Sequence, residues 1–319
     1  MDIQEAINNH KLILAEAAVV ESLRRSKDAI LHPRLEHALL IYDESGKKLL
    51  SKLYNDFISV ARQSEIPITI CAPTWRANYE RISEADITSN LNVDAVSFTR
   101  LIRASWKSWA SNIFVGGLIG CKNDCYKPGE GLSREEAKAF HLWQINQIAE
   151  AGVDFLLAAT LPAVSEASGI ALAMANTKIP YIISFVINKE GLILDGNSLA
   201  FAFNEIDSIC HNPPLGYMIN CAYPSFLNAQ KQPKSVLSRL IGYQANASSL
   251  DQKELDGAET LQTNPISDWG KWMIELNRKF GVKILGGCCG TSCKHLQYIV
   301  QNINNQSWKP RPSGLGTSL

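Results

Sequence analysis

Two adjacent cysteines near the C-terminal end are the residues of this sequence best suited to chemistry. Cys288 and Cys289 lie in the glycine-rich segment 286–291 (GGCCGT), directly after the apolar run 282–285. Neighbouring side chains on a strand point to opposite faces, so both thiols can reach one ion only if the strand ends before them. A disulfide between them is disfavoured, because a trans peptide places their Cα atoms about 3.8 Å apart, below the usual disulfide range. The pair therefore suits a soft metal ion.

A third cysteine, Cys221, follows the apolar run 216–220. In a parallel barrel the carboxyl ends of all strands open onto one face, so Cys221 can meet the pair there. Three thiolates with one open position are typical of catalytic zinc sites, whereas structural sites take four ligands. Cys293 is the alternative fourth ligand, but it falls inside the next helical segment. We therefore predict a zinc site held by Cys221, Cys288 and Cys289.

The other cysteines have a plainer interpretation. We expect Cys71, Cys210 and Cys293 to be buried packing residues, because free cysteine behaves as a small apolar side chain. Cys121 and Cys125 are expected to be ordinary thiols of a loop. Disulfides are not expected, because eight cysteines in a chain without a recognisable secretion signal are better explained as thiols or ligands.

Eight short apolar runs alternate with longer segments of helical periodicity. The runs are residues 11–14, 67–71, 113–119, 154–158, 181–187, 216–220, 239–243 and 282–285. The helical segments are residues 46–63, 92–109, 133–151, 164–176, 199–210, 269–280 and 292–304, the third opening with a capping box of Ser133 and Glu136. Continuous apolar strands alternating with helices predict a parallel sheet buried on both faces. We expect an α/β fold with a single (β/α)₈ TIM barrel; a doubly wound open sheet is the alternative, disfavoured because no glycine-rich phosphate motif follows the first strand.

The domain boundaries and partners follow from composition. We expect one barrel domain over residues 1–309 and a flexible C-terminal tail over the Pro/Gly/Ser-rich residues 310–319. The formal net charge of zero argues against nucleic-acid binding. No apolar run approaches the roughly 18 residues that cross a membrane, and no signal peptide is visible, so a cytoplasmic protein is expected.

The segment 286–291, together with the pair Asn220–Cys221, resembles the homocysteine S-methyltransferase family. Weaker similarity covers most of the chain, at residues 74–75, 116–120, 152–156, 160–162, 183–185 and 243–246. The resemblance implies a zinc-containing barrel with Cys221, Cys288 and Cys289 as the ligands. It also implies transfer of a methyl group from S-methylmethionine, betaine or a methylated corrinoid to the thiol of homocysteine, which belongs to methionine biosynthesis. No catalytic residue beyond the zinc site is expected.

Two departures from the family pattern concern the acceptor. Ala15 and Ala159 stand where the family has acids expected to hold the amino group of homocysteine. Homocysteine is therefore the default acceptor, and a different thiol is the alternative. Glu16, next to the first departure, is a candidate replacement for the missing acid; the other interpretation is a supporting or exposed residue.

Three further residues are candidates for binding substrate. Trp75 can face a sulfonium or quaternary ammonium group through a cation–π contact, or simply pack at the barrel mouth. Asn220 can bind substrate or orient Cys221, and Thr160 lies in a motif shared with the family. Arg76 is expected to be a solvated loop residue, with carboxylate binding as the alternative.

The sequence leaves other classes of function open. The small-molecule partners predicted are a thiol acceptor and a methyl donor, and a corrinoid protein or a homo-oligomer is an alternative partner. A diverged, non-catalytic zinc-binding barrel is the second class of function. The intact cysteines favour an enzyme, whereas the two missing acids favour divergence.

Overall fold

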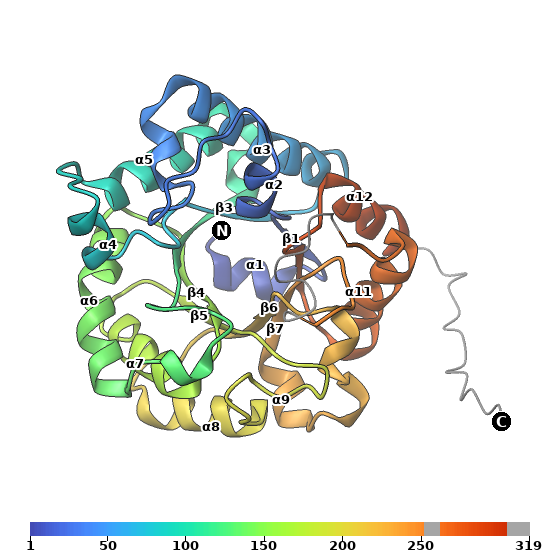
Figure 1. Ribbon diagram of the computed structural model, residues 1–319. Coiled ribbons are helices and arrows are strands. Elements are labelled where there is room, and N and C mark those ends of the chain that lie inside the picture. Colours follow the sequence, from blue (N-terminus) through green and yellow to red (C-terminus); the bar gives the residue numbers. More distant parts are fainter. Residues whose placement is uncertain (252–261, 305–319) are drawn as a thin grey trace.

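A closed barrel of eight parallel strands forms the centre of the molecule (Figure 1). The computed structural model describes residues 1–251 and 262–304. The strands are β1 (Ile13–Ala15), β2 (Ile68–Cys71), β3 (Ile113–Ile119), β4 (Phe155–Leu161), β5 (Tyr181–Phe185), β6 (Gly216–Asn220), β7 (Leu240–Ala245) and β8 (Ile284–Gly287). They pair in chain order, and β8 closes onto β1. This closure confirms the predicted (β/α)₈ barrel and excludes the open sheet.

Helices surround the barrel and connect its strands (Figure 1). The α-helices are α1 (Ile3–Asn9), α2 (Val20–Arg24), α3 (Glu44–Gln63), α4 (Tyr79–Glu84), α5 (Leu91–Ser105), α6 (Arg134–Glu150), α7 (Val164–Met174), α8 (Leu199–Ile209), α9 (Lys234–Arg239), α11 (Ile266–Phe280) and α12 (Cys293–Asn302). The 3₁₀ helices are η1 (Ala38–Tyr42), η2 (Lys107–Asn112), η3 (Pro128–Glu130), η4 (Pro224–Leu227) and η5 (Ala229–Lys231). All seven predicted helical segments form helices, and α6 carries the predicted capping box. The helix predicted to reach residue 109 instead ends at Ser105, because Lys107 adopts a left-handed φ of 52°.

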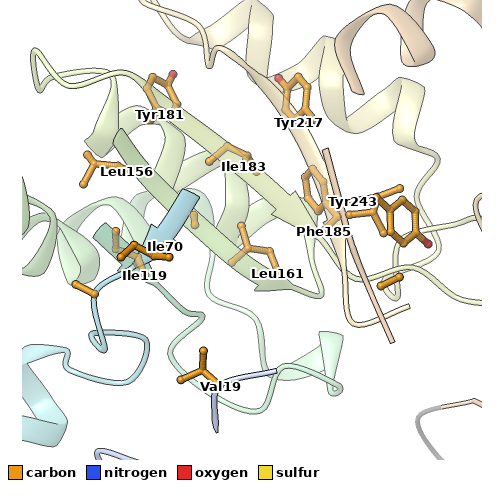
Figure 2. Close-up of a cluster of buried hydrophobic side chains, with 14 of the residues drawn as sticks. Val19, Ile70, Ile119, Leu156, Leu161, Tyr181, Ile183, Phe185, Tyr217 and Tyr243 are labelled. Carbon is orange, nitrogen blue, oxygen red and sulfur yellow. The ribbon is translucent and has the colours of Figure 1, made fainter. Parts of the chain in front are cut away.

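Alternate side chains of the strands enter two separate apolar clusters. Outward-facing residues pack under the helices, as Figure 2 shows for Leu156 and Ile183 among others. Inward-facing residues fill the barrel, and on β4 these are Phe155, Leu157 and Ala159. Both faces of the sheet are therefore apolar, which explains why the strands read as continuous apolar runs.

Helix α1, which the sequence patterns did not reveal, closes the amino-terminal end of the barrel. Its residues Ile3 and Ala6 are fully buried against the first residues of several strands, such as Ile13 and Ile284. Asp2 caps the helix in a capping box with Glu5. With one end filled by α1 (Figure 1), the carboxyl ends of the strands are left as the open end of the barrel.

Two predictions from the sequence concern residues that the structure does not fully describe: the domain boundary with its tail, and the absence of a membrane-spanning segment. The predicted tail over residues 310–319, and with it the domain boundary at residue 309, lies outside the described residues. Within the described part of the chain, no helix is long and apolar enough to cross a membrane.

The close packing of α6 against α7 provides a test of the fold. A Cβ added at Gly169 would lie 2.3 Å from the carbonyl oxygen of Arg134 and 2.6 Å from Cβ of Ala137. We expect Gly169→Ala to lower the free energy of unfolding by about 1–3 kcal/mol, the usual range for overpacking. Gly129→Ala is the control, because nothing lies within 4 Å of its added Cβ. Urea unfolding of both variants measures the difference, and equal stability of the two would contradict the packing described.

Candidate metal centre and substrate cavity

Three cysteines converge at the open end of the barrel. The sulfur atoms of Cys221, Cys288 and Cys289 all lie within 4.8 Å of one another. Sγ of Cys221 is 2.7 Å from Sγ of Cys288, too long for a disulfide bond. Thiolates bound tetrahedrally to one zinc ion at about 2.3 Å lie roughly 3.8 Å apart, so small shifts of these side chains would suit such an ion. The structure thus brings together the three residues predicted from the sequence, in an arrangement that can hold a soft metal.

The turn that carries the cysteine pair begins where β8 ends, at Gly287, as predicted. Its backbone is tied to both neighbouring strands: the amide of Gly287 donates to the carbonyl of Glu16 (3.0 Å), and that of Cys288 donates to the carbonyl of Ala245 (2.7 Å). A Cβ on Gly287 would lie 2.1 Å from Oγ1 of Thr291, so only glycine fits at this position. The paired strand end therefore sets where the turn starts.

The side chain of Thr291 supports this turn through two hydrogen bonds. Its hydroxyl donates to the carbonyl of Cys288 (2.6 Å) and accepts from the amide of Ala18 (3.2 Å). The N-cap of α12 is the next residue, Ser292. The side chain of Thr291 is already used by the turn.

Cys221 is held by a saturated hydrogen-bond network around Asn220. The side-chain amide of Asn220 donates to Sγ of Cys221 (3.2 Å) and to Oγ1 of Thr160 (2.8 Å). Its oxygen accepts from the amide of Thr160 (2.9 Å) and from the hydroxyl of Ser184 (2.7 Å). An asparagine side chain offers two donor hydrogens and two lone pairs, and all four are occupied here. The network favours orientation of Cys221 over substrate binding as the role of Asn220.

The backbone around Cys221 is unusual in two places. Cys221 has a φ of 54° and Thr160 a φ of 62°, both in the left-handed region that is rare for residues other than glycine. At Thr160 the pairing of β4 with β5 shifts register between Ala158 and Leu161. This irregularity turns the Thr160 amide toward Asn220. Strained backbone of this kind is typical of functional sites.

A cavity of about 400 Å³ lies beside the cysteine cluster. Its lining includes the three cysteines and all four predicted substrate-binding residues, Glu16, Trp75, Thr160 and Asn220. It also includes Ala17, Ala18, Val19, Val20, Glu21, Arg24, Glu36, His37, Tyr54, Cys71, Ala72, Arg76, Leu118, Asp124, Cys125, Tyr126, Leu157, Ala159, Gln244 and Gly287. The cavity is large enough for a small substrate next to the sulfur atoms.

Glu16 is buried at this cavity and is not exposed. Only 7% of it is accessible, and its Oε2 accepts the amide of Cys71 at 2.9 Å. Burial raises the pKa of Glu16 to about 8, although the Cys71 hydrogen bond acts in the opposite direction. At neutral pH Glu16 is therefore mainly a neutral acid. Of the two departures from the family, Ala159 lines the cavity, whereas Ala15 packs in the barrel interior.

Trp75 and Arg76 form a stacked pair in the cavity lining. The guanidinium carbon of Arg76 lies 4.2 Å from the centre of the Trp75 ring. One face of the ring is thus covered by the chain's own cation, which weighs against a cation–π contact with a donor on that face. The expectation that Arg76 is a solvated loop residue is wrong, since only 9% of it is accessible.

Several cavity residues could not be identified from the sequence. Arg24, Glu36 and His37 come from the connection between β1 and α3, while Asp124 and Tyr126 come from the connection between β3 and α6. Burial lowers the pKa of His37 to about 4, so it is neutral. Arg24 ends the short helix α2 and the other four residues lie in irregular segments. No motif marks any of them, so only the tertiary structure reveals these residues.

Arg24 lines the cavity, and its charge acts on the cysteine cluster. Its guanidinium is paired with Glu36. Hydrogen bonds from Cys221 and Cys288 lower the pKa of Cys289 well below its usual range, and the charge of Arg24 acts in the same direction. The site thus favours thiolate at Cys289.

The remaining cysteines lie outside the cluster. Cys293 begins α12 and is only partly buried, not fully buried as predicted, and desolvation raises its pKa to about 11. Its sulfur is not among the three that converge. Cys71 and Cys210 are buried, as predicted. Cys121 and Cys125 are thiols of the loop between β3 and α6, as predicted, and both are buried.

Comparison with known proteins identifies the family. A sequence model described as homocysteine S-methyltransferase matches residues 11–303, which contain the whole cysteine cluster. The chain belongs to the homocysteine S-methyltransferase family. Membership confirms both the resemblance and the enzyme class that the cysteine motif predicts, an S-methyltransferase.

Individual relatives of this homocysteine S-methyltransferase family member are distant. Homocysteine S-methyltransferase YbgG of Bacillus subtilis is 23% identical over 316 residues, covering 93% of this chain and 96% of the relative. Homocysteine S-methyltransferase 2 of Arabidopsis thaliana is 28% identical over 188 residues, covering 56% of this chain and 54% of the relative. The chain thus spans about half the length of the plant relatives that it matches.

A solved structure shows the same fold. The homocysteine methyltransferase MmuM from Escherichia coli, in its metallated form, matches with a TM-score of 0.70 and 16% identity, covering 93% of this chain and 98% of MmuM. At this level of identity the likeness concerns the barrel alone.

The buried acid Glu16 provides a test of the cavity's electrostatics. Its pKa is 4.5 when exposed and about 8 in the fold, so between these values only the unfolded chain releases the proton. Stability should therefore fall as pH rises through this window, by up to about 1.4 kcal/mol per pH unit. Glu16→Gln keeps the oxygen that accepts from Cys71 but cannot ionise. We expect the variant to gain stability relative to wild type between pH 5 and pH 8.

Urea unfolding at both pH values measures this gain. Glu136→Gln is the control, because Glu136 is exposed at the start of α6 and makes only local contacts. A parallel pH dependence in wild type and Glu16→Gln would show that Glu16 is ionised in the folded protein.

Proposed function

We propose that this protein is a zinc-dependent S-methyltransferase that moves a methyl group from a small donor to a thiol, with homocysteine as the default acceptor. The observation that carries the proposal is the convergence of three cysteines beside a cavity large enough for a small substrate. The names of relatives support it: YbgG is a homocysteine S-methyltransferase, and the MmuM structure is described as metallated. A relative from Brassica oleracea, a selenocysteine Se-methyltransferase, fits the same type of acceptor atom.

Zinc is the metal that this ligand set favours. Thiolates select soft ions such as zinc, whereas magnesium and calcium prefer oxygen ligands. Three sulfur ligands leave a fourth position for a substrate. None of the eight cysteines forms a disulfide, which fits the reducing environment of the cytoplasm.

The chemistry requires a nucleophilic sulfur. A free thiol has a pKa of about 8.5 and is mostly protonated at neutral pH. When bound, zinc would favour the thiolate of the acceptor at the open position. The acceptor sulfur forms a bond to the methyl carbon while the bond from that carbon to the donor breaks, and the donor leaves with the electron pair. The thiol proton goes to solvent, and a homocysteine acceptor becomes methionine.

The protein's own residues hold this reaction in place. Asn220 fixes the direction of the Cys221 sulfur, and the turn at Gly287 fixes Cys288 and Cys289. The cavity places acceptor and donor next to the cluster, so that attack is effectively intramolecular. The donor type proposed is S-methylmethionine, betaine or a methylated corrinoid, with a corrinoid protein or a second copy of the chain as the alternative partner.

Metal content tests the centre directly. Metal-replete expression and elemental analysis should give about one zinc per chain, since zinc takes three to four such ligands in one site. The Cys288→Ala/Cys289→Ala double variant should lose the ion, because one thiolate cannot hold it. Cys293→Ala should keep the ion, because Cys293 is outside the cluster. Full zinc in the double variant would place the site elsewhere.

Methyl transfer tests the function. Wild type should methylate homocysteine with at least one of S-methylmethionine, betaine and methylcobalamin, and Cys221→Ala should abolish this turnover. Circular dichroism and thermal melting of the variant should stay near wild type, since the ligands follow the strands and the core lies elsewhere. A variant that fails to fold would indicate a structural metal. No turnover of any thiol by zinc-loaded wild type would favour the non-catalytic barrel.

A further inference from the structure

Arg76 is a buried cation without an acidic partner in the part of the chain that the structure describes. Only 9% of it is accessible, and no carboxylate among residues 1–251 and 262–304 lies within 4.0 Å of it. Two half-buried arginines, by contrast, have an acidic partner: Arg103 pairs with Asp154 and Arg239 pairs with Asp207. An unpaired buried charge is costly, so a missing anion is expected at Arg76.

The hydrogen bonds of Arg76 leave one edge of its guanidinium available. Nη1 donates to the carbonyls of Cys121 (2.9 Å) and Asn123 (2.8 Å), which uses both of its hydrogens. The guanidinium also has a side-chain hydrogen bond with the thiol of Cys121. Nε and Nη2 donate to no oxygen or nitrogen atom in the described part of the chain, and neither is among the side-chain atoms sealed from solvent without a partner. These two nitrogens form the edge that binds a carboxylate with two parallel hydrogen bonds. Stacking on Trp75 fixes the plane of the Arg76 guanidinium at the cavity wall.

The groups closest to Arg76 do not neutralise it. Burial raises the pKa of Cys121 to about 12 and that of Cys125 to about 11, despite the opposing effect of Arg76, so both thiols stay protonated. Glu16 is a neutral acid at pH 7. Arg76 therefore keeps a positive charge in the cavity lining that these neighbouring groups do not neutralise.

The three other acids that line the cavity have partners of their own. Glu36 pairs with Arg24, Glu21 pairs with Arg25, and Asp124 lies 3.7 Å from Lys127. The lining residue at position 159 is alanine, whose side chain has neither a negative charge nor a hydrogen-bond acceptor for an ammonium group. An anionic ligand thus fits this cavity better than one whose recognition depends on an ammonium.

We propose that Arg76 binds the carboxylate of the acceptor thiol side-on through Nε and Nη2, and that the cavity does not select for an ammonium group. The proposal rests on the proposed function, because it names the class of acceptor for the same site: a small thiol that carries a carboxylate. Arg76 is a specificity residue in this role. A mercapto-carboxylic acid should bind as well as the amino acid of the same length.

Calorimetric titration of the zinc-loaded full chain tests the proposal with three probes. These are homocysteine, 4-mercaptobutanoate, which lacks the ammonium, and 4-mercaptobutanamide, which also lacks the negative charge. Wild type should bind the acid at least about tenfold more tightly than the amide, as loss of a charged hydrogen-bonded contact predicts. Homocysteine should bind no more tightly than the acid. In Arg76→Gln, the preference for acid over amide should fall below about twofold, with the affinity for the amide unchanged.

Two variants separate anion binding from a merely structural role. Arg81→Gln is the matched control: Arg81 also donates to two backbone carbonyls, those of Arg34 and Lys122, but it does not line the cavity. It should keep the wild-type preference. Arg76→Lys keeps the charge without the fork and should keep part of the preference.

Three results would overturn the proposal. These are an equal loss of acid and amide affinity in Arg76→Gln, no preference for the acid in wild type, and homocysteine binding more than about tenfold tighter than 4-mercaptobutanoate. Binding is measured apart from methyl transfer. A preference for the acid without turnover would therefore support the role of Arg76 and contradict only the proposed function, whereas turnover without the preference would do the reverse.

Discussion

The pairing of β8 with its two neighbouring strands is the constraint on which the site depends. Closure of the barrel brings the end of β1 against the end of β8, so the carbonyl of Glu16 receives the amide of Gly287 just before the cysteine pair. On the other side β7 receives the amide of Cys288. Both thiols are thus positioned by backbone hydrogen bonds between strands far apart in the sequence. A barrel that failed to close would leave the pair without a defined direction.

Cys221 is positioned by different means. At the end of β6, side-chain hydrogen bonds support the ligand. All four hydrogen-bonding sites of the Asn220 side chain are occupied by Cys221, Thr160 and Ser184. A network that is fully satisfied is rigid, because any displacement breaks several bonds in a buried setting. Cys221 also has a main-chain bond, since its amide donates to the carbonyl of Gln244 in β7 (3.2 Å), and the side chain of Thr291 supports Cys288 in turn. Such independent supports keep the three sulfur atoms together before any ion arrives.

The sequence predicted the barrel and the cysteine cluster because both depend on local patterns. Apolar runs mark the strands, and the glycines around Cys288 mark a turn that packing alone would not require. The burial of Arg76 could not be predicted, because its guanidinium donates to the carbonyls of Cys121 and Asn123, which lie on a different loop. Glu16 was recognised as a candidate acid, but its neutral state follows from burial that no pattern reveals. Helix α1 was missed because seven residues are too few to show a period.

The position of α1 has a consequence for the order of events at the site. By filling the amino end of the barrel with Ile3 and Ala6, it denies the cavity a second entrance along the barrel axis. A donor and an acceptor must then pass through the same opening, and whichever lies deeper has to enter first and leave last. Kinetics on such a scaffold are expected to follow a compulsory sequence, with one product trapped behind the other until the outer one departs. The short helix at the start of the chain would in this way determine the order in which substrates enter and products leave.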